Sequence, residues 1–191
     1  MVERLKEEYN VDVEWRPFYL HWDTPPEGRD LPEHVKRTRA AGSEERLSQI
    51  ARSYGMKFTS TTRIYNTRLA HEATEFGREH GKANEFHHAL FLKVYAEGRD
   101  PSQWEVLRSA AEEAGLSADE MQREVESGKY TAGVEAQVRQ AYGIGVSGVP
   151  TYVINDRYAI VGARPYEVFQ QALVGILSRG GSDQDAGPDD G

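Results

Sequence analysis

The 191-residue sequence predicts an α/β fold in which a small sheet is interrupted by a long run of helices. Two patterns point to the sheet. Residues 11–15 alternate apolar and polar side chains, and residues 149–161 contain two short runs of β-branched and aromatic residues. Between them, residues 31–142 carry apolar side chains at helical spacing, separated by capping residues and glycines. The strands are therefore expected near the two ends of the chain.

The first segment is predicted to be a helix followed by a strand. Apolar residues recur near helical spacing among charges over residues 2–9, which is typical of a helix with one buried side. The alternation over residues 11–15 predicts a half-buried strand with Trp15 in the core, and Phe18 is expected there as well. Pro17 ends the strand, because proline cannot donate to a strand ladder.

Residues 31–142 are predicted to form an all-helical insertion. Residues whose side chains can accept a hydrogen bond from the first helical turn stand at four starts, namely Asp30, Ser43, Asp100 and Ser117. Glycines stand at the ends, namely Gly42, Gly55, Gly81, Gly115 and Gly128. A last helix covers about residues 131–142. In the helix after Ser43, Leu47 and Ile50 are expected to face inward.

Residues 143–163 carry the most specific pattern in the chain. Three glycines in six positions precede an apolar run that starts near Pro150, and Asn155-Asp156-Arg157 separates that run from residues 158–161. Asn and Asp between two β-prone runs favour a hairpin. A proline there belongs at a strand end, or where something outside the sheet takes the place of its missing donor.

A helix is predicted to follow the hairpin. Pro165 suits a first helical turn, and a stripe of apolar residues comes after it. The side chains expected on the buried face are Val168, Phe169, Leu173 and Ile176.

Residues 145–154, Gly-Val-Ser-Gly-Val-Pro-Thr-Tyr-Val-Ile, followed by Gly162-Ala163 and a helix, resemble the cis-proline segment of the DsbA family of thioredoxin-fold proteins. The resemblance is closest to the FrnE-like subgroup, which is related to the 2-hydroxychromene-2-carboxylate isomerases. Residues 11–20 and the segment Asn66-Thr-Arg-Leu-Ala-His71 also resemble this family. The resemblance implies a thioredoxin-like, DsbA-type sheet with a large all-helical insertion.

The resemblance also implies a domain organisation and a binding site. Residues 1–30 and 143–178 would form the thioredoxin-like domain, residues 31–142 the inserted helical domain, and residues 179–191 a disordered acidic tail. It further implies that the Val149–Pro150 peptide bond is cis. Val149, Pro150 and Thr151 would then contact the partner, which is an extended peptide or a small thiol compound.

The sequence departs from the family at its start. The family has a first strand and a Cys-x-x-Cys motif ahead of the first helix, whereas this sequence begins within that helix and contains no cysteine. We therefore expect an N-terminally truncated sheet and an incomplete chain. Residues 11–18 would pair directly with residues 149–154, borrow a strand from another chain, or leave exposed edges that favour a homo-oligomer.

Composition excludes several classes of partner. The formal net charge is −8, and Asp183, Asp185, Asp189 and Asp190 supply four of these charges, so the rest of the chain carries about −4. We find no basic face for nucleic acid, no apolar stretch long enough for a membrane span, and no apolar core of a signal peptide. These features predict a cytoplasmic protein that binds neither nucleic acid nor membrane.

Other constellations favour structural roles. His71, His80, His87 and His88 lack the i, i+4 spacing of a zinc-binding helix, so we expect no metal site and no cofactor. The three acidic residues of one helix side are expected on a solvated face; they are Glu72, Glu75 and Glu79. No neighbouring base activates Ser147 or Thr151 in the sequence, so no catalytic residue is assigned. The roles of Tyr19 and Trp22, core or groove, stay open.

Three functions stay open. The first is a DsbA-family oxidoreductase whose cysteines lie upstream of Met1. The second is a cysteine-free module that binds an extended peptide at the Val149–Pro150 edge by strand addition. The third is a relative of glutathione-dependent isomerases or transferases, which the resemblance also suggests. Disulfide exchange requires a thiolate, so the chain as written is not expected to be redox-active.

Overall fold

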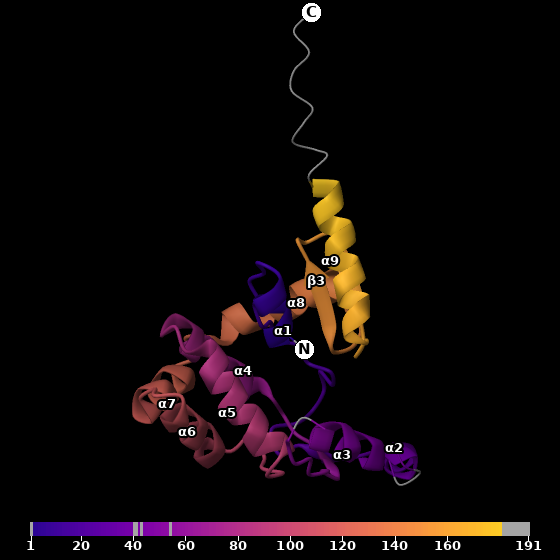
Figure 1. Cartoon of the computed structure of the whole chain (residues 1–191). Coiled ribbons are helices and arrows are strands. Elements are labelled where there is room, and N and C mark those ends of the chain that lie inside the picture. Colours follow the sequence, from indigo (N-terminus) through magenta and orange to yellow (C-terminus); the bar gives the residue numbers. More distant parts are fainter. Residues whose placement is uncertain (1, 40–41, 43, 54, 181–191) are drawn as a thin grey trace, which may run out of the picture. The chain divides into compact units, whose positions relative to one another are not determined.

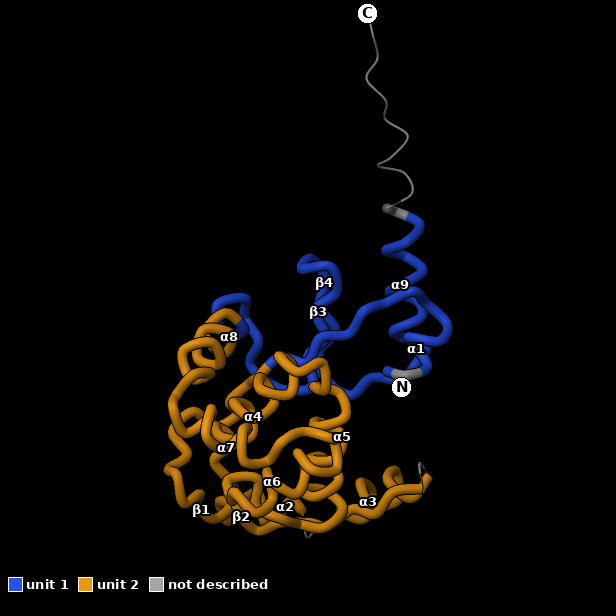
Figure 2. The backbone as a smooth tube through the Cα atoms, turned by 90° about the vertical axis from the view of Figure 1, so that its left-hand side faces the viewer, with its two compact units in different colours: residues 1–16, 141–191 blue, residues 17–140 orange. Residues whose placement is uncertain are grey.

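A computed structural model describes residues 2–39, 42, 44–53 and 55–180. The chain divides into two compact units (Figure 2). Unit 1 comprises residues 1–16 and 141–191, and unit 2 comprises residues 17–140. Each unit has its own apolar cluster. The domain ranges expected from the sequence stay a prediction.

Unit 1 combines a two-stranded hairpin with a long helix (Figure 1). Its elements are α1 (Val2–Glu8), β3 (Thr151–Ile154), β4 (Tyr158–Val161) and α9 (Tyr166–Gly180). The strands pair antiparallel, from Thr151 opposite Val161 to Ile154 opposite Tyr158. One face of the hairpin packs on α9, and the Tyr152 and Phe169 rings meet edge to face with centroids 4.7 Å apart.

The hairpin turn has the geometry that the sequence predicts. Asn155 and Asp156 have φ values of 50° and 53°, and the Arg157 N–H donates to the Ile154 carbonyl at 3.2 Å. Positive φ at both central residues defines a type I′ turn, whose twist matches that of the flanking strands. Asn and Asp tolerate this conformation better than other residues with a side chain.

The strand predicted over residues 11–15 is not formed. These residues belong to no strand, and within the described residues β3 pairs with β4 alone. Val11 instead packs against the apolar cluster of unit 1 around Phe169, while Trp15 is 38% exposed rather than in the core. Alternation creates a face to bury, but a strand exists only where a neighbour accepts its hydrogen bonds.

Unit 2 is mostly helical (Figure 1). Its elements are β1 (Arg29–Asp30), α2 (Glu33–Thr38), α3 (Glu44–Ser53), β2 (Arg63–Ile64), α4 (Arg68–Glu79), α5 (Ala83–Tyr95), α6 (Trp104–Glu113), α7 (Ala118–Glu126) and α8 (Thr131–Gly143), the last turn of α8 belonging to unit 1. The two-residue strands β1 and β2 pair antiparallel and are too short to leave a pattern in the sequence. No described helix has the length and apolar character that crossing a lipid bilayer requires.

The core of unit 2 lies between α4, α5, α6 and α7. Fully buried side chains come from each of these helices, namely Phe76, Phe86, Leu107 and Met121. Gly77 permits α4 and α5 to approach closely, because a Cβ at this position would lie 3.4 Å from the Phe86 Cβ. Phe86 and Leu90, four residues apart on α5, are both buried.

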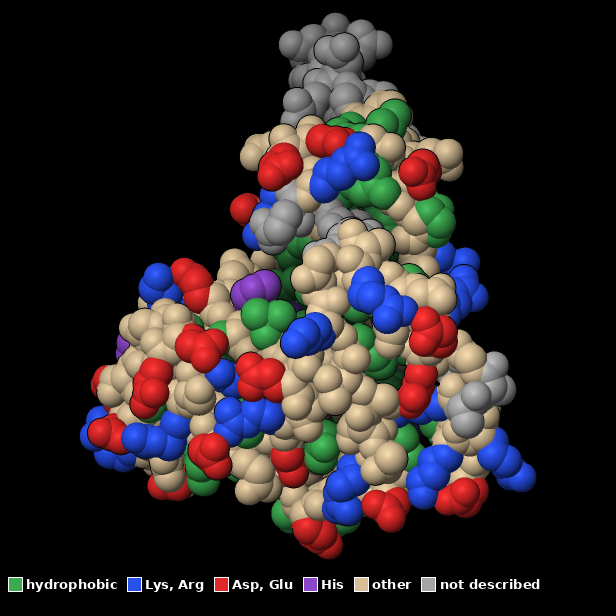
Figure 3. All heavy atoms as spheres, turned by 60° about the horizontal axis from the view of Figure 1, so that its bottom comes forward, with side chains coloured by type: hydrophobic (Ala, Val, Ile, Leu, Met, Phe, Trp, Pro, Cys, Tyr) green, Lys and Arg blue, Asp and Glu red, His purple; other side chains and the backbone are tan. Residues whose placement is uncertain are grey.

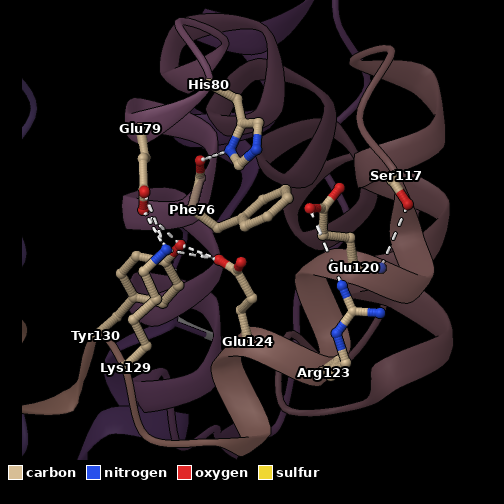
Figure 4. A network of polar contacts seen from close by, with 9 residues as sticks. All are labelled: Phe76, Glu79, His80, Ser117, Glu120, Arg123, Glu124, Lys129 and Tyr130. Atoms are coloured by element: carbon tan, nitrogen blue, oxygen red, sulfur yellow. Dashed lines mark hydrogen bonds and ion pairs between the residues drawn. The ribbon is translucent and has the colours of Figure 1, made fainter.

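Of the three predicted helix-capping residues that the structure describes, one is confirmed. Ser117 caps α7 as predicted, since its Oγ accepts from the Glu120 N–H at 3.3 Å (Figure 4). Asp100 does not cap α6; it accepts from the Ser102 N–H at 2.8 Å in the preceding turn, and the cap position is Gln103. Pro32, rather than Asp30, occupies the cap position of α2. Ser43 lies outside the described residues. Of the tail predicted over residues 179–191, residues 179 and 180 belong to α9 and the rest lie outside the described residues.

Of two expected buried faces, that of α3 is wrong and that of α9 is confirmed in part. Leu47 and Ile50 of α3 are each 48% exposed, and α3 has no buried residue. In α9, Phe169 and Leu173 are buried, whereas Val168 is exposed. Helical periodicity identifies an apolar stripe but does not identify which element covers it.

Replacing Phe169 with alanine is expected to destabilise unit 1 by about 3–5 kcal/mol, because the ring is nearly fully buried and leaves a cavity. The matched control is Val174→Ala in the same helix, at a side chain that is 57% exposed and should change stability by less than about 0.5 kcal/mol. Hydrogen exchange of β3 and α9 amides at increasing urea concentration measures the change in stability caused by each variant. Equal effects of the two variants would contradict the core described above.

Candidate functional site

The candidate binding edge consists of Val149, Pro150 and Thr151 at the start of β3. The Val149 side chain is 54% exposed, Pro150 is exposed, and the peptide bond between them is cis. The Thr151 hydroxyl donates to the Gly148 carbonyl at 2.7 Å, and the Gly162 N–H donates to the Pro150 carbonyl at 2.8 Å. Hydrogen bonds therefore anchor the backbone of this edge while the Val149 side chain points to solvent.

The side of β3 away from β4 is open within the described part of the chain. An unpaired strand edge presents N–H and C=O groups that can pair with another extended chain. The register places Thr151, Val153, Ala159 and Val161 on the face opposite α9. Val153 and Val161 are exposed there. Unit 1 thus offers an extended ligand both a backbone edge and apolar side chains.

The Asn66–His71 segment connects a loop to the start of α4. Asn66 donates through Nδ2 to the Thr24 carbonyl at 2.8 Å, and its Oδ1 accepts from the Arg68 N–H at 3.0 Å. One amide side chain thereby ties residues far apart in sequence to the first turn of a helix. Asn66 therefore has a structural role, and this role accounts for the segment without a ligand.

The expectation of a solvated acidic face on α4 is wrong at Glu72. This side chain is only 2% exposed, and its Oε1 accepts from Arg68 Nε and from Thr131 Oγ1, both at 2.9 Å. A buried carboxylate is retained where charged and polar partners compensate its desolvation. Glu75 is largely covered too and pairs with Arg78 at 3.1 Å.

Glu79, at the end of α4, takes part in a network that links α4 to α7 and to the residues before α8 (Figure 4). Lys129 Nζ donates to Glu79 and to Glu124, each at 2.9 Å. The Tyr130 hydroxyl lies 2.8 Å from Glu79 and 2.6 Å from Glu124. Hydrogen bonds from Lys129 and Tyr130 lower the pKa of Glu79, and burial together with both carboxylates raises the pKa of Tyr130. Every polar group of the network is paired, which indicates a structural link.

The His71 ring lies beside that of Tyr19, with ring centroids 5.6 Å apart. Tyr19 also meets the exposed Trp22 edge to face at 5.4 Å, so the two aromatic residues left open by the sequence lie together. The His71 ring donates a hydrogen bond to the Phe18 backbone, and its Nε2 is buried without a partner among the described residues. Burial lowers the pKa of His71 to about 4, so the ring is neutral at physiological pH.

Among the described residues, the remaining histidines take part in no group of metal ligands. No three His, Asp or Glu side chains there are grouped as metal ligands. His80 Nδ1 lies 2.9 Å from the Phe76 carbonyl of its own helix. No side-chain base is hydrogen-bonded to Ser147 or Thr151 in this part of the chain.

Charge on the visible surface does not favour nucleic acid. On the face drawn in Figure 3, basic and acidic side chains of the described residues are interspersed. A nucleic-acid interface typically gathers Lys and Arg in one patch or stripe. This face lacks such a cluster.

Sequence reasoning missed the contacts of Tyr19 with His71 and of Glu72 with Thr131. In each case the partners are separated by more than fifty residues, and no local pattern reveals them. The one related feature in the sequence is the Asn66–His71 segment. It marks the start of α4, the helix that contains both His71 and Glu72.

A protein family and a curated protein are similar to this chain in sequence. The profile of the DSBA-like thioredoxin domain matches residues 1–174. An uncharacterized Bacillus subtilis protein, YwbO, is 26% identical over 167 residues, covering 86% of this chain and 82% of that protein.

Two solved structures are also similar. A probable DsbA oxidoreductase from Streptomyces coelicolor has a TM-score of 0.77 at 25% identity, covering 92% of this chain and 76% of that one. A 2-hydroxychromene-2-carboxylate isomerase has a TM-score of 0.73 at 19% identity, covering 97% and 90%. The second likeness is one of fold.

Acidification from pH 6.5 to about 4 is expected to destabilise the protein through His71. The unfolded chain takes up the proton near pH 6.5, whereas the folded chain resists it until about pH 4. Between these pH values the unfolded state therefore binds more protons than the folded state. The free energy of unfolding decreases as the pH decreases, by about 3 kcal/mol at most.

Urea denaturation at several pH values tests this dependence, with wild type compared against His71→Gln. The variant should lose this part of the pH dependence, and His34→Gln, at an exposed position of α2, should keep it. Identical pH profiles for wild type and His71→Gln would show that His71 does not titrate as described.

Proposed function

Because this chain belongs to the family of DSBA-like thioredoxin domains, we propose that it binds an extended peptide along β3, at Val149, Pro150 and Thr151, without exchanging disulfides itself. The observation that carries the proposal is an anchored, exposed strand edge in a chain without cysteine. A small thiol compound is the alternative ligand for the same edge.

The absence of redox chemistry follows from the residues of the chain. Disulfide exchange begins with attack of a thiolate on a disulfide sulfur and passes through a mixed disulfide. None of the 191 residues is cysteine, and a serine or threonine hydroxyl cannot accept or return the electrons. Binding is therefore the part of the family's chemistry that these residues can carry out alone.

Strand addition is supported by the geometry of β3. Its backbone is held on one side by β4 and by the hydrogen bonds at Thr151 and Pro150, while the other side has no ladder partner among the described residues. A peptide paired there would gain main-chain hydrogen bonds, and the exposed Val153 would contact its side chains. Pairing with a second copy of the chain would use the same edge.

A second candidate is an oxidoreductase whose thiols come from outside these 191 residues. The similarity to the probable DsbA oxidoreductase from Streptomyces coelicolor favours it. Sequencing the DNA upstream of Met1 tests it: an in-frame strand followed by Cys-x-x-Cys would support it, and an in-frame stop directly before Met1 would remove it. The isomerase likeness, being one of fold, gives no independent support for a glutathione-dependent enzyme.

The purified 191-residue chain is expected not to accelerate reduction of insulin by dithiothreitol. The reason is the lack of any thiolate, and the measurement is the turbidity of precipitating insulin chains, with thioredoxin as the positive control. A rate above that of the buffer, free of contaminating reductase, would overturn this expectation.

Peptide binding should depend on the Val149–Pro150 edge. The measurement is fluorescence anisotropy of a labelled, unstructured peptide with alternating valine and threonine. Val149→Asp is expected to weaken binding about tenfold, because it places a charge where an apolar contact forms, and Pro150→Ala should weaken it as well.

Val174→Asp is the matched control, since it adds the same charge at an exposed valine of α9. Unchanged affinity in Val149→Asp, or no binding by the wild type, would leave strand addition without support. Competition by reduced glutathione would instead favour the small thiol compound.

A further inference from the structure

A hollow of about 450 Å³ lies between the hairpin turn with β4 and the C-terminal half of α9. Figure 1 shows the hairpin beside this helix. The hollow is separate from the Val149–Thr151 edge, and none of the residues that line it belongs to that edge. Its volume falls within the range of about 300–1,000 Å³ that small-molecule sites occupy.

The walls of the hollow are mostly apolar. Ile154 and Ile160 contribute from the hairpin, and Ile176 and Gly175 contribute from α9. At Gly175 the helix leaves open space, because a Cβ built there would meet no atom within 4 Å. The lining can therefore accept an apolar group without any change in the backbone.

The lining of the hollow also includes one positively charged side chain. Arg157, in the turn, lines the hollow, and its guanidinium has no ion-pair partner among the described residues. The lining contains no acidic residue; Asp156, its neighbour in the turn, is not part of it. Gln171 adds an amide that can donate or accept a hydrogen bond. An apolar surface with an unpaired guanidinium is complementary to a ligand with an apolar body and an anionic head.

We infer that this hollow binds a small amphipathic carboxylate, with its hydrocarbon part against Ile154, Ile160 and Ile176 and its carboxylate on Arg157. Guanidinium groups recognise carboxylates through parallel hydrogen bonds, which gives the site a preference for anions over neutral molecules of equal length. The site is independent of peptide binding at β3, so either can fail without the other.

Isothermal titration calorimetry of the full chain tests the site with octanoate, below its micelle concentration, and with 1-octanol as the neutral counterpart. Octanoate is expected to bind saturably in the millimolar range or tighter, and more tightly than 1-octanol. Arg157→Gln should weaken octanoate binding about tenfold and leave 1-octanol unchanged. Arg139→Gln, on the exposed side of α8, is the matched charge control and should bind as wild type does.

Gly175→Leu should abolish binding of both molecules, because its side chain fills the hollow. Leucine also favours a helix over glycine, so the variant is expected to fold. Gly133→Leu in α8, where a Cβ would likewise meet no atom within 4 Å, is its control and should bind normally. Amide chemical shifts in the nuclear magnetic resonance spectrum should move at residues 157 and 175 when octanoate is added.

Three results would overturn the inference. They are no saturable octanoate binding by the wild type, octanoate binding that neither Arg157→Gln nor Gly175→Leu weakens, and equal affinity for octanoate and 1-octanol. Because Arg157 is an exposed turn residue, its variant gives an answer even if Gly175→Leu were to fold poorly.

Discussion

The hydrogen-bonding demand of the strand backbone is the constraint on which unit 1 depends. The β3–β4 ladder satisfies one edge of each strand, and an isolated hairpin of this size is marginally stable in water. Contact with α9 adds the burial of apolar side chains that a hairpin alone does not provide, as in the packing of Tyr152 against Phe169. The hairpin is thus held by a helix on one face, while its other face and the outer edge of β3 stay available for a ligand.

Unit 2 meets the same demand in another way. Helices satisfy their own backbone groups, so α4 to α7 need only bury apolar side chains such as Phe76 and Phe86. Charged side chains then fasten the helices at defined points: Glu72 binds Arg68 and Thr131, and the Glu79 network joins α4 to α7. These carboxylates are structural, although acidic residues on a helix can also resemble a catalytic pair.

The chemistry that these residues allow is recognition rather than electron transfer. This chain has an open strand edge and a cis Val149–Pro150 bond although it contains no thiol. The same hairpin also borders the apolar hollow that Arg157 lines. Two different ligands could therefore use two sides of one small element, with backbone hydrogen bonds selecting the first and charge selecting the second.

The sequence by itself determined the features that depend on neighbouring residues. These are the family, the hairpin turn at Asn155-Asp156, the cap at Ser117 and the exclusion of thiol chemistry. The tertiary structure decided the burial of Glu72, the exposure of Leu47 and the absence of a strand over residues 11–15. The physical reason is range: a turn or a cap is a local conformation, whereas burial and strand pairing depend on partners distant in the chain.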